Sequence, residues 1–432
     1  MKRIISLAVL STIASVVAAE ELSYGVEVSN VSMRQMSDRH RTVEVSYNLT
    51  SSDGVSPAWV RLDILTNGVS IGMENIKNVT GDWTTNAASA VSPGMHMLRW
   101  AAKKDWPGHF ATNVDAVIRA YTTNQLHQIP GVYMVVDVSG GQSAQRYPVS
   151  YTLCPPLNSN ENLGDKIWLR RIEACPEGFL MGSPDDEEGR SAYAGNAANI
   201  NERLHKVMLT EPFFAGVFPI TYQQYVNVIA KATGDLSGGI YSPIDYVSYR
   251  DIRGATTEGS VTVNWPTTLH QVGTGSFLAA IRSRTGITFD LPTEAQWEYA
   301  CRAGTTTAWN NGTGISTNAV GVDANLDLLG WYKGNSNDSL PRVGLKNPNA
   351  WGLYDCHGSV GEFCLDWIQG GYSADDQTDP QGPISAWTNW RAYRSGSFRM
   401  DAYRSRSAYR GWGQTETSRT RGIGFRLFAI IE

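Results

Sequence analysis

Residues 349–367 read Asn-Ala-Trp-Gly-Leu-Tyr-Asp-Cys-His-Gly-Ser-Val-Gly-Glu-Phe-Cys-Leu-Asp-Trp, a stretch in which three glycines separate aromatic, acidic and sulfur-containing side chains. Its apolar residues follow neither a period of 2 nor a period of 3.6, so the pattern is poor for a helix or a surface strand. Gly352, Gly358 and Gly361 mark positions where the backbone turns sharply or packs too closely for a Cβ atom. We therefore expect a tightly folded loop.

Two carboxylates, Asp355 and Glu362, lie within this stretch. Carboxylates on a glycine-kinked loop, with backbone carbonyls free to point inward, supply the oxygen ligands that Ca²⁺ prefers. A simpler interpretation is that the aromatic side chains belong to a core and the acids cap turns. The spacing is not that of an EF-hand loop, so the residues alone leave both interpretations open.

The length and composition bound the kind of protein. A chain of 432 residues is long enough for two or three domains with sizeable cores. Its 14 Trp, 19 Tyr and 42 Gly favour a loop-rich protein with an aromatic core over a helical bundle. The formal charge of −5 gives no reason to expect binding to nucleic acid or to an anionic membrane.

The N-terminus has the pattern of a secretory signal peptide, which we place at residues 1–19. Lys2 and Arg3 precede an apolar run over residues 4–17, which is too short for a comfortable membrane span. Glu20 occupies the first mature position, so no lipid-accepting cysteine stands there. We therefore expect a secreted or periplasmic protein without a membrane span.

The cysteines are odd in number, so at least one thiol is free or paired between chains. Their spacing fits neither C-x-x-C nor Cys/His zinc pairs. Sequence does not fix the connectivity, but the candidate disulfides are Cys356–Cys364 and Cys154–Cys175. Cys301 would then be a buried free thiol.

The first part of the chain predicts short strands with no helices between them. Residues 42–49 and 59–65 alternate apolar and polar side chains, and the second run ends at Asn67-Gly68, a hairpin signal. Strands at this spacing favour an antiparallel sandwich. We predict an all-β, immunoglobulin-like domain over residues 20–125, acting as a spacer or interaction module.

The second domain, residues 130–432, has a mixed pattern and is predicted as α+β. Helices are expected over 222–232, 267–283 and 294–303, the last with Thr293 as N-cap and Gln296 three residues later. Long segments rich in Gly, Asn, Ser and Trp follow. Loops of that length are functional, or are held by ions and buried aromatic side chains.

Four motifs occur in a fixed order in this domain: Phe179-Leu-Met-Gly-Ser183, Leu291-Pro-Thr-Glu-Ala-Gln-Trp-Glu-Tyr-Ala300, residues 349–363, and Gly424-Phe-Arg-Leu427. Together they resemble the sulfatase-modifying-factor (formylglycine-generating enzyme) family over roughly residues 165–432. The resemblance implies a fold distantly related to C-type lectins, with little regular secondary structure. It also implies bound Ca²⁺.

The resemblance places ligands on the stretch quoted first. The positions that match the family's second calcium site are Asp355 and Glu362 by side chain, and Gly358 and Val360 by carbonyl oxygen. This agrees with the oxygen-only site expected from the residues, so a structural Ca²⁺ is the predicted cofactor.

The enzymatic part of the resemblance is incomplete. Formylglycine-generating enzymes oxidise a cysteine of a sulfatase peptide with O₂ and with Cu(I) held by two thiolates, which are suitable ligands for that soft ion. This chain has no cysteine after Cys364, and Met400 and Ala402 stand about where the thiolates belong. We therefore do not expect copper.

Residues 391–426 contain nine arginines, and two interpretations stay open. In the first, the arginines are buried partners of acids such as Glu294, Glu298 and Asp366. In the second, they line a groove for an anionic or sugar ligand. The groove residues would be Ser397, Arg404, Arg406, Tyr409, Arg410 and Trp412.

These observations predict an exported, non-catalytic binding or scaffolding protein (a pseudoenzyme) with structural calcium and an unknown protein or glycan ligand. Nucleic acid is not an expected partner. The alternative is a formylglycine-generating oxidoreductase that oxidises a sulfatase cysteine with altered metal ligands.

Overall fold

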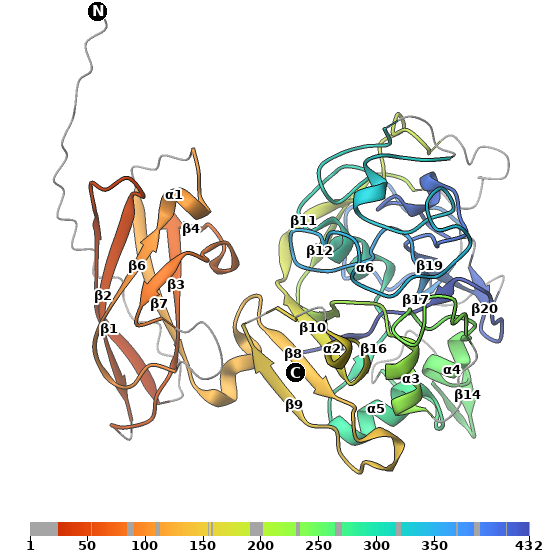
Figure 1. Ribbon diagram of the computed structural model, residues 1–432, viewed down its shortest axis with the longest axis horizontal. Coiled ribbons are helices and arrows are strands. Elements are labelled where there is room, and N and C mark those ends of the chain that lie inside the picture. The colour runs from red at the N-terminus through yellow and green to blue at the C-terminus, as the bar shows by residue number, and fades with distance from the viewer. Residues whose placement is uncertain are drawn as a thin grey trace, which may run out of the picture. The chain divides into compact units, whose positions relative to one another are not determined.

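The computed structural model describes residues 25–431, except 53, 84–89, 109–112, 154, 157–158, 191–201, 230–233, 264–269, 317–320, 369, 384–388 and 412. The chain divides into two compact units: an N-terminal unit of residues 1–132 and 151–154, and a C-terminal unit of residues 133–150 and 155–432 (Figure 1). The predicted signal peptide, residues 1–19, lies outside the described residues. Within the described part of the chain, no helix has the length and apolar character needed to cross a membrane.

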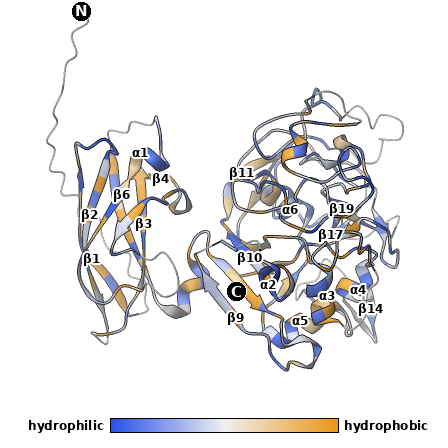
Figure 2. Cartoon of the chain, in the orientation of Figure 1, coloured by the Kyte–Doolittle hydropathy of each residue, from blue (hydrophilic) through white to orange (hydrophobic). Residues whose placement is uncertain are grey.

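The N-terminal unit consists of two antiparallel sheets, with strand orders β1-β2-β6-β5 and β4-β3-β7. Its elements are β1 (Val26–Gln35), β2 (Thr42–Ser51), β3 (Trp59–Thr66), β4 (Val69–Ser70), η1 (Met73–Asn75), β5 (Val79–Gly81), β6 (Gly94–Ala101), α1 (Ala102–Asp105), β7 (Val114–Tyr121) and η2 (Thr123–Gln128). Hydropathy alternates along the strands (Figure 2), and β2 buries every second residue from Val43 to Leu49. Inward side chains of both sheets form one apolar cluster.

The turn prediction in this unit is confirmed. Asn67 and Gly68 join β3 to β4, and both have positive φ, 52° and 81°, as a tight hairpin turn requires. The immunoglobulin-like assignment stays a prediction.

The C-terminal unit is mixed α/β, with a six-stranded sheet in the order β16-β22-β13-β10-β8-β9 and smaller sheets β11-β12-β18, β14-β15 and β20-β19-β17-β21. The strands are β8 (Tyr133–Asp137), β9 (Val149–Thr152), β10 (Lys166–Ile172), β11 (Cys175–Met181), β12 (His205–Leu209), β13 (Phe213–Gly216), β14 (Thr257–Glu258), β15 (Val261–Thr262), β16 (Phe289–Asp290), β17 (Gly361–Trp367), β18 (Gln377–Thr378), β19 (Trp390–Arg394), β20 (Gln414–Thr415), β21 (Ile423–Gly424) and β22 (Phe428–Ile430). The helices are η3 (Gly141–Ser143), α2 (Asn160–Gly164), α3 (Tyr222–Val228), α4 (Tyr249–Arg253), α5 (Phe277–Thr285), α6 (Glu294–Arg302), η6 (Leu326–Leu328) and η7 (Ala402–Ser405).

Local capping explains which helix predictions succeed. Thr293 accepts a hydrogen bond from the backbone N of Gln296, and the Gln296 side chain accepts one from the backbone N of Thr293, so α6 begins where the capping box predicts. The prediction of a helix from residue 267 was wrong in extent. Gly275 has φ of 75° and Ser276 caps α5, so the helix starts at Phe277.

The loop prediction for residues 349–367 was wrong for its second part. Gly361–Trp367 forms β17, which pairs with β19 and β21, and all seven of its residues are buried. A strand buried on both faces shows no alternation of apolar and polar residues, which is why the period gave no signal.

The first part of that stretch is a loop in close backbone contact with residues 330–331. A Cβ atom on Gly330 would lie 1.6 Å from the carbonyl oxygen of His357, and one on Gly358 would lie 2.3 Å from that of Trp331. Ser359 donates its backbone N–H to the carbonyl of Trp331 at 2.7 Å. The expected close approach at Gly358 is therefore present.

A buried ion cluster joins β16 to helices α4 and α5. The Asp290 carboxylate, in β16, receives bonds from Arg253 of α4 at 3.0 and 3.2 Å and from Arg282 of α5 at 3.2 Å. Burial alone would raise the pKa of Asp290, but Arg253, His270 and Arg282 outweigh it and lower the pKa to about 2. Asp290 thus orients His270, whose imidazole Nδ1 lies 3.4 Å from its Oδ2.

Asp290→Asn tests this cluster through pH. A folded pKa lowered from 3.8 to about 2 gives stabilisation of about 2 kcal/mol that is fully present above about pH 4 and lost as pH falls through about 2. Urea unfolding across this pH range should show the variant less stable at neutral pH and the difference shrinking in acid. Asp338→Asn, at a carboxylate whose side chain is 60% exposed, should cost little at any pH. Equal stability of wild type and Asp290→Asn at neutral pH would contradict the assignment.

Gly330→Ala tests the backbone contact with His357. The added Cβ meets backbone rather than a movable side chain, so we expect a loss of at least about 2 kcal/mol in unfolding free energy. Gly314→Ala is the matched control, because a Cβ there has no neighbour within 4 Å. Denaturant unfolding of the two variants measures the contrast, and a Gly330→Ala protein as stable as Gly314→Ala would show that the packing is misassigned.

Candidate functional site

Glu362 lies at the point where three of the sequence motifs meet. Its buried carboxylate accepts two hydrogen bonds from Arg426, at 2.8 and 2.9 Å, and one from Trp297 Nε1 at 2.6 Å. Arg426 comes from the Gly-Phe-Arg-Leu motif and Trp297 from α6. One oxygen, Oε1, accepts a single bond, so it retains a lone pair for a further partner.

Asp355 is the other predicted acidic ligand, and it is buried at a left-handed φ of 57°. Its Oδ2 accepts from the backbone N of Gly344 at 2.8 Å, whereas its Oδ1 has no hydrogen-bond partner among the described residues. Burial raises the pKa of Asp355 to about 6, and the negative charge of Glu362 adds to the rise. A buried carboxylate oxygen without a donor requires a cation or a proton beside it.

The predicted calcium ligands therefore fit the ion by their chemistry. Asp355 and Glu362 offer carboxylate oxygens, and Gly358 and Val360 are buried in the loop between them. The carbonyl of Gly358 also accepts from Ser395 Oγ at 2.9 Å. No group of three or more His, Cys, Asp or Glu side chains suited to a metal occurs in the part of the chain that the structure describes, so backbone carbonyls would have to complete such a site. Calcium binding stays a prediction.

The positions expected for the copper thiolates are occupied by Met400 and Ala402, and Ala402 is part of an apolar core. Ala402 is fully buried in an apolar cluster with Trp309, Leu326 and Tyr332. Met400 is partly buried. These positions therefore offer one thioether and no thiolate.

The cysteines do not pair as predicted. Cys356 and Cys364 are both free, so the predicted disulfide between them was wrong. Cys364 lies in the extended strand β17, and its thiol donates to the carbonyl of Glu362, whereas the thiol of Cys356 donates to that of Tyr354. Cys175 is also free, and Cys154 lies outside the described residues.

Cys301 is the buried free thiol that the sequence predicted, and it belongs to a cluster that the sequence did not predict. Its Sγ lies 3.8 Å from the carbonyl oxygen of Cys356 and 3.9 Å from His357 Nε2. Burial, with a contribution from Cys356, raises the pKa of the Cys301 thiol well above its ordinary value. Residues 301 and 356 are far apart in the chain, so their spacing gave no signal.

His357 in this cluster is fully hydrogen-bonded. Its Nδ1 lies 2.7 Å from the carbonyl oxygen of Ser405, and its Nε2 accepts from the backbone N of Asn310 at 3.0 Å. Burial lowers its pKa to about 4, so the imidazole is neutral at physiological pH. Neither His357 nor Cys301 is activated as a base or nucleophile here.

Five of the nine arginines in residues 391–426 form buried ion pairs with carboxylates. The pairs are Arg391 with Glu416, Arg394 with Glu294 and Glu298, Arg406 with Glu187 and Glu202, Arg410 with Glu294, and Arg426 with Glu362. For Arg406 and Arg410 the structure favours the ion-pair interpretation over the open groove. A buried guanidinium that already donates to carboxylates has few N–H groups left for a ligand.

The remaining groove residues are distributed differently. Ser397 and Tyr409 are buried, and Arg404 is partly exposed and donates to Tyr403 and Tyr409 hydroxyls at 3.0 and 3.3 Å. Trp412 lies outside the described residues. The structure thus does not bring these side chains together as a surface groove, and their role in ligand binding stays a prediction.

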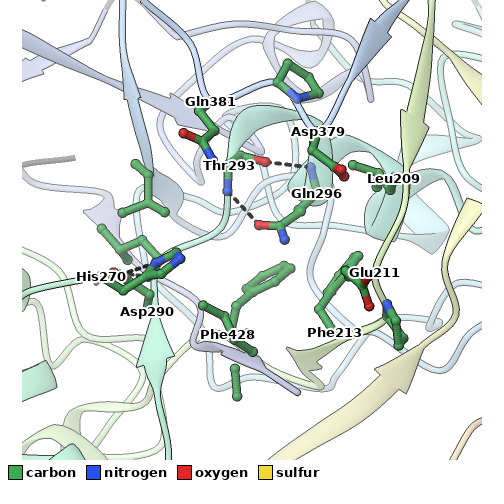
Figure 3. Close-up of a pocket in the computed structure, with 16 residues that line it drawn as sticks. Leu209, Glu211, Phe213, His270, Asp290, Thr293, Gln296, Asp379, Gln381 and Phe428 are labelled. Carbon is green, nitrogen blue, oxygen red and sulfur yellow. Dashed lines mark hydrogen bonds and ion pairs between the residues drawn. The ribbon is translucent and has the colours of Figure 1, made fainter. Parts of the chain in front are cut away.

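A cavity of about 220 Å³ lies in the C-terminal unit beside the start of α6 (Figure 3). Apolar side chains of β12, β13 and β22 line it, including Leu209, Phe213 and Phe428. His270 and Gln296 also line it. The sequence analysis did not identify this cavity, because its residues come from six separate segments of the chain.

Comparison with known proteins places the C-terminal unit in a family. The family model described as "Sulfatase-modifying factor enzyme 1-like domain" matches residues 176–430. A formylglycine-generating enzyme of Streptomyces coelicolor is 35% identical over 147 residues, covering 32% of this chain and 45% of that protein. The mouse enzyme of the same name is 31% identical over 153 residues, covering 32% and 38%.

Other matches have different names. A serine/threonine-protein kinase of Chlamydia pneumoniae is 27% identical over 219 residues, covering 49% of this chain and 32% of the kinase. Among solved structures, Treponema denticola variable protein 1 aligns with a TM-score of 0.47 at 22% identity, covering 64% of this chain and 100% of that chain. The chain spans between about a third and a half of the length of these three curated relatives.

The family model covers more than half of the chain, in the region where the four motifs were found. The resemblance predicted from those motifs is confirmed. This chain belongs to the sulfatase-modifying factor enzyme 1-like (formylglycine-generating enzyme) family.

Proposed function

We propose that this family member is an exported, non-catalytic binding or scaffolding protein with structural calcium. The observation that carries the proposal is the packing of Ala402 with Trp309, Leu326 and Tyr332. Where the resemblance calls for a thiolate pair to hold Cu(I), this chain has a methyl group in an apolar core. Soft thiolates are what select Cu(I), and a core of this kind has no equivalent donor.

The alternative, a formylglycine-generating oxidoreductase with altered ligands, would need two thiols that a peptide can reach. Cys301 and Cys356 approach each other, but they are only 1% and 3% exposed. Burial raises the pKa of the Cys301 thiol, which opposes thiolate formation. These facts favour the binding protein.

Calcium has a structural role in this proposal. Asp355 and Glu362 would hold the ion with the carbonyls of Gly358 and Val360. Bound Ca²⁺ would supply positive charge beside the Oδ1 of Asp355, which lacks a donor. It would thereby remove the cost of burying that carboxylate.

The proposed export and the proposed role of the N-terminal unit rest on the sequence. Residues 1–19 have the composition of a signal peptide, and export to a secreted or periplasmic location follows from that pattern. The N-terminal unit, as an immunoglobulin-like domain over residues 20–125, would act as a spacer or interaction module. The ligand of the whole protein would be another protein or a glycan.

An activity assay tests the non-catalytic assignment. Protein starting at Glu20 is incubated with a Cys-x-Pro-x-Arg peptide, Cu(I), O₂ and a thiol reductant, and the peptide is followed by mass spectrometry. We expect no conversion of the peptide cysteine, since Met400 and Ala402 stand about where the copper thiolates are expected. An authentic formylglycine-generating enzyme run in parallel provides the positive control. Appearance of the aldehyde would refute the proposal and turn attention to Cys301 and Cys356.

Thermal melting with and without a chelator tests the calcium assignment. An ion bound only by the native state and present at about a hundred times its Kd stabilises that state by about 2.7 kcal/mol. The chelator should therefore lower the Tm of wild-type protein by several degrees, whereas Asp355→Ala should melt at the same temperature in both conditions. Asp376→Ala, at an exposed acid outside the loop, should respond as wild type does. An unchanged wild-type Tm would show that Asp355 and Glu362 hold no calcium.

A further inference from the structure

Two cysteines from distant parts of the chain, Cys301 and Cys356, meet in the core of the C-terminal unit. Cys301 lies in the last turn of α6, and Cys356 lies in the loop before β17. Both side chains belong to the same apolar cluster and hydrogen-bond to each other. The Sγ of Cys301 also lies 3.8 Å from the carbonyl oxygen of Cys356. The two thiols are therefore neighbours in the folded chain.

The buried side chain of Asn349 fixes the backbone on both sides of this contact. Its nitrogen donates to the carbonyls of Ala300 and Cys301 at 2.7 and 3.1 Å, and its Oδ1 accepts from the backbone N of Leu353 at 3.0 Å. The end of α6 is thus tied by main-chain hydrogen bonds to the loop that carries Cys356. A disulfide requires its two Cα atoms to stay close, so this clamp favours one.

Cys364, the other buried cysteine of the described chain, has different surroundings. Its thiol donates to the carbonyl of Glu362 in its own strand. Burial and the nearby carboxylates of Glu294 and Asp366 raise the pKa of this thiol well above its ordinary value. Negative charge beside a sulfur opposes the thiolate that disulfide exchange requires. Cys301 is therefore the better partner for Cys356.

We propose that Cys301 and Cys356 are a redox pair that forms a disulfide when the chain folds in an oxidising compartment. The S–H bonds of both residues break and one S–S bond forms between them. Two electrons and two protons pass to the oxidant, a low-molecular-weight disulfide such as oxidised glutathione, which becomes two thiols. The inference rests on the proposed export for its setting, because disulfides persist mainly outside the cytoplasm.

The bond closes a long segment that has little regular secondary structure. Within residues 303–355 the described part of the chain has one short helix, η6. Helix and sheet hydrogen bonds therefore hold little of this segment. The bond also lies next to Asp355, the proposed calcium ligand, and ties that residue to α6. A cross-link over a loop of this length stabilises the native state by restricting the unfolded chain.

Burial determines when the bond forms. Cys301 is buried, and burial together with the Cys356 side chain raises the pKa of its thiol well above the ordinary value. Thiol–disulfide exchange needs both a thiolate and access for the oxidant. The bond therefore forms before the core closes, and the same burial protects it from reduction afterwards.

The test refolds the full chain in a glutathione buffer that favours oxidation and, in parallel, in a thiol reductant, with the same calcium concentration in both. Free thiols are blocked with N-ethylmaleimide in denaturant, and the digest is analysed by mass spectrometry. We expect a cross-linked pair of peptides that contain Cys301 and Cys356. We also expect the Tm of the oxidised protein to lie about 5 °C or more above that of the reduced protein.

Cys301→Ser and Cys356→Ser should each abolish the cross-link and the redox-dependent part of the Tm. Cys364→Ser is the matched control, because it makes the same change at a buried cysteine outside the pair, and it should keep both. The inference is overturned if Cys301 and Cys356 are both alkylated in the oxidised sample, or if either is linked to Cys154, Cys175 or Cys364 instead.

Mass spectrometry of the unsubstituted chain decides the matter even if a variant does not fold. The peptide assay runs in a thiol reductant, and the chelator changes melting through calcium alone. Absence of the disulfide would therefore leave both of those results untouched, so this inference and the proposed function fail separately.

Discussion

The pairing of Glu362 with Arg426 is the interaction on which the C-terminal unit depends most. Both side chains are almost fully buried, and burying an unpaired charge costs several kcal/mol. Arg426 meets that cost by donating to both oxygens of Glu362 and to the carbonyls of Gly216, Val217 and Tyr354. One guanidinium thus joins the end of β13 to the loop before β17 and to β17 itself, which follow more than a hundred residues later in the chain.

Buried ion pairs also anchor other loops of this unit to α6. Glu298 of α6 accepts from Arg302 and from the backbone N of Gly182, and it also pairs with Arg394. Glu294, one turn earlier, pairs with Arg394 and Arg410. The motif Thr-Glu-Ala-Gln-Trp-Glu therefore encodes the anchoring of loops to one helix. Because these residues stabilise the fold, a match to them shows family membership and leaves the chemistry to be decided at the site.

Sequence reasoning succeeded where the signal was local. The capping box at Thr293 and the hairpin turn at Asn67-Gly68 involve neighbours within a few residues, and the structure has both. Reasoning failed where partners are distant. The period of β17 gave no signal because both its faces are buried, and the approach of Cys301 to Cys356 follows only from the tertiary fold. For the same reason the sequence left open whether Arg406 and Arg410 are buried or face a ligand.

The burial of those arginines limits which parts of the protein could bind a ligand. The buried guanidinium of Arg406 donates to Glu187 and Glu202. If it turned toward a ligand, those carboxylates would be left as unpaired buried charges. The binding proposed above would therefore have to use polar groups that are not already paired inside the folded protein. Gln296 is such a group, because the helix cap uses its side-chain oxygen and leaves its side-chain nitrogen directed into the cavity beside α6 (Figure 3). The side of α6 turned toward that cavity therefore keeps a hydrogen-bond donor that none of the described residues uses.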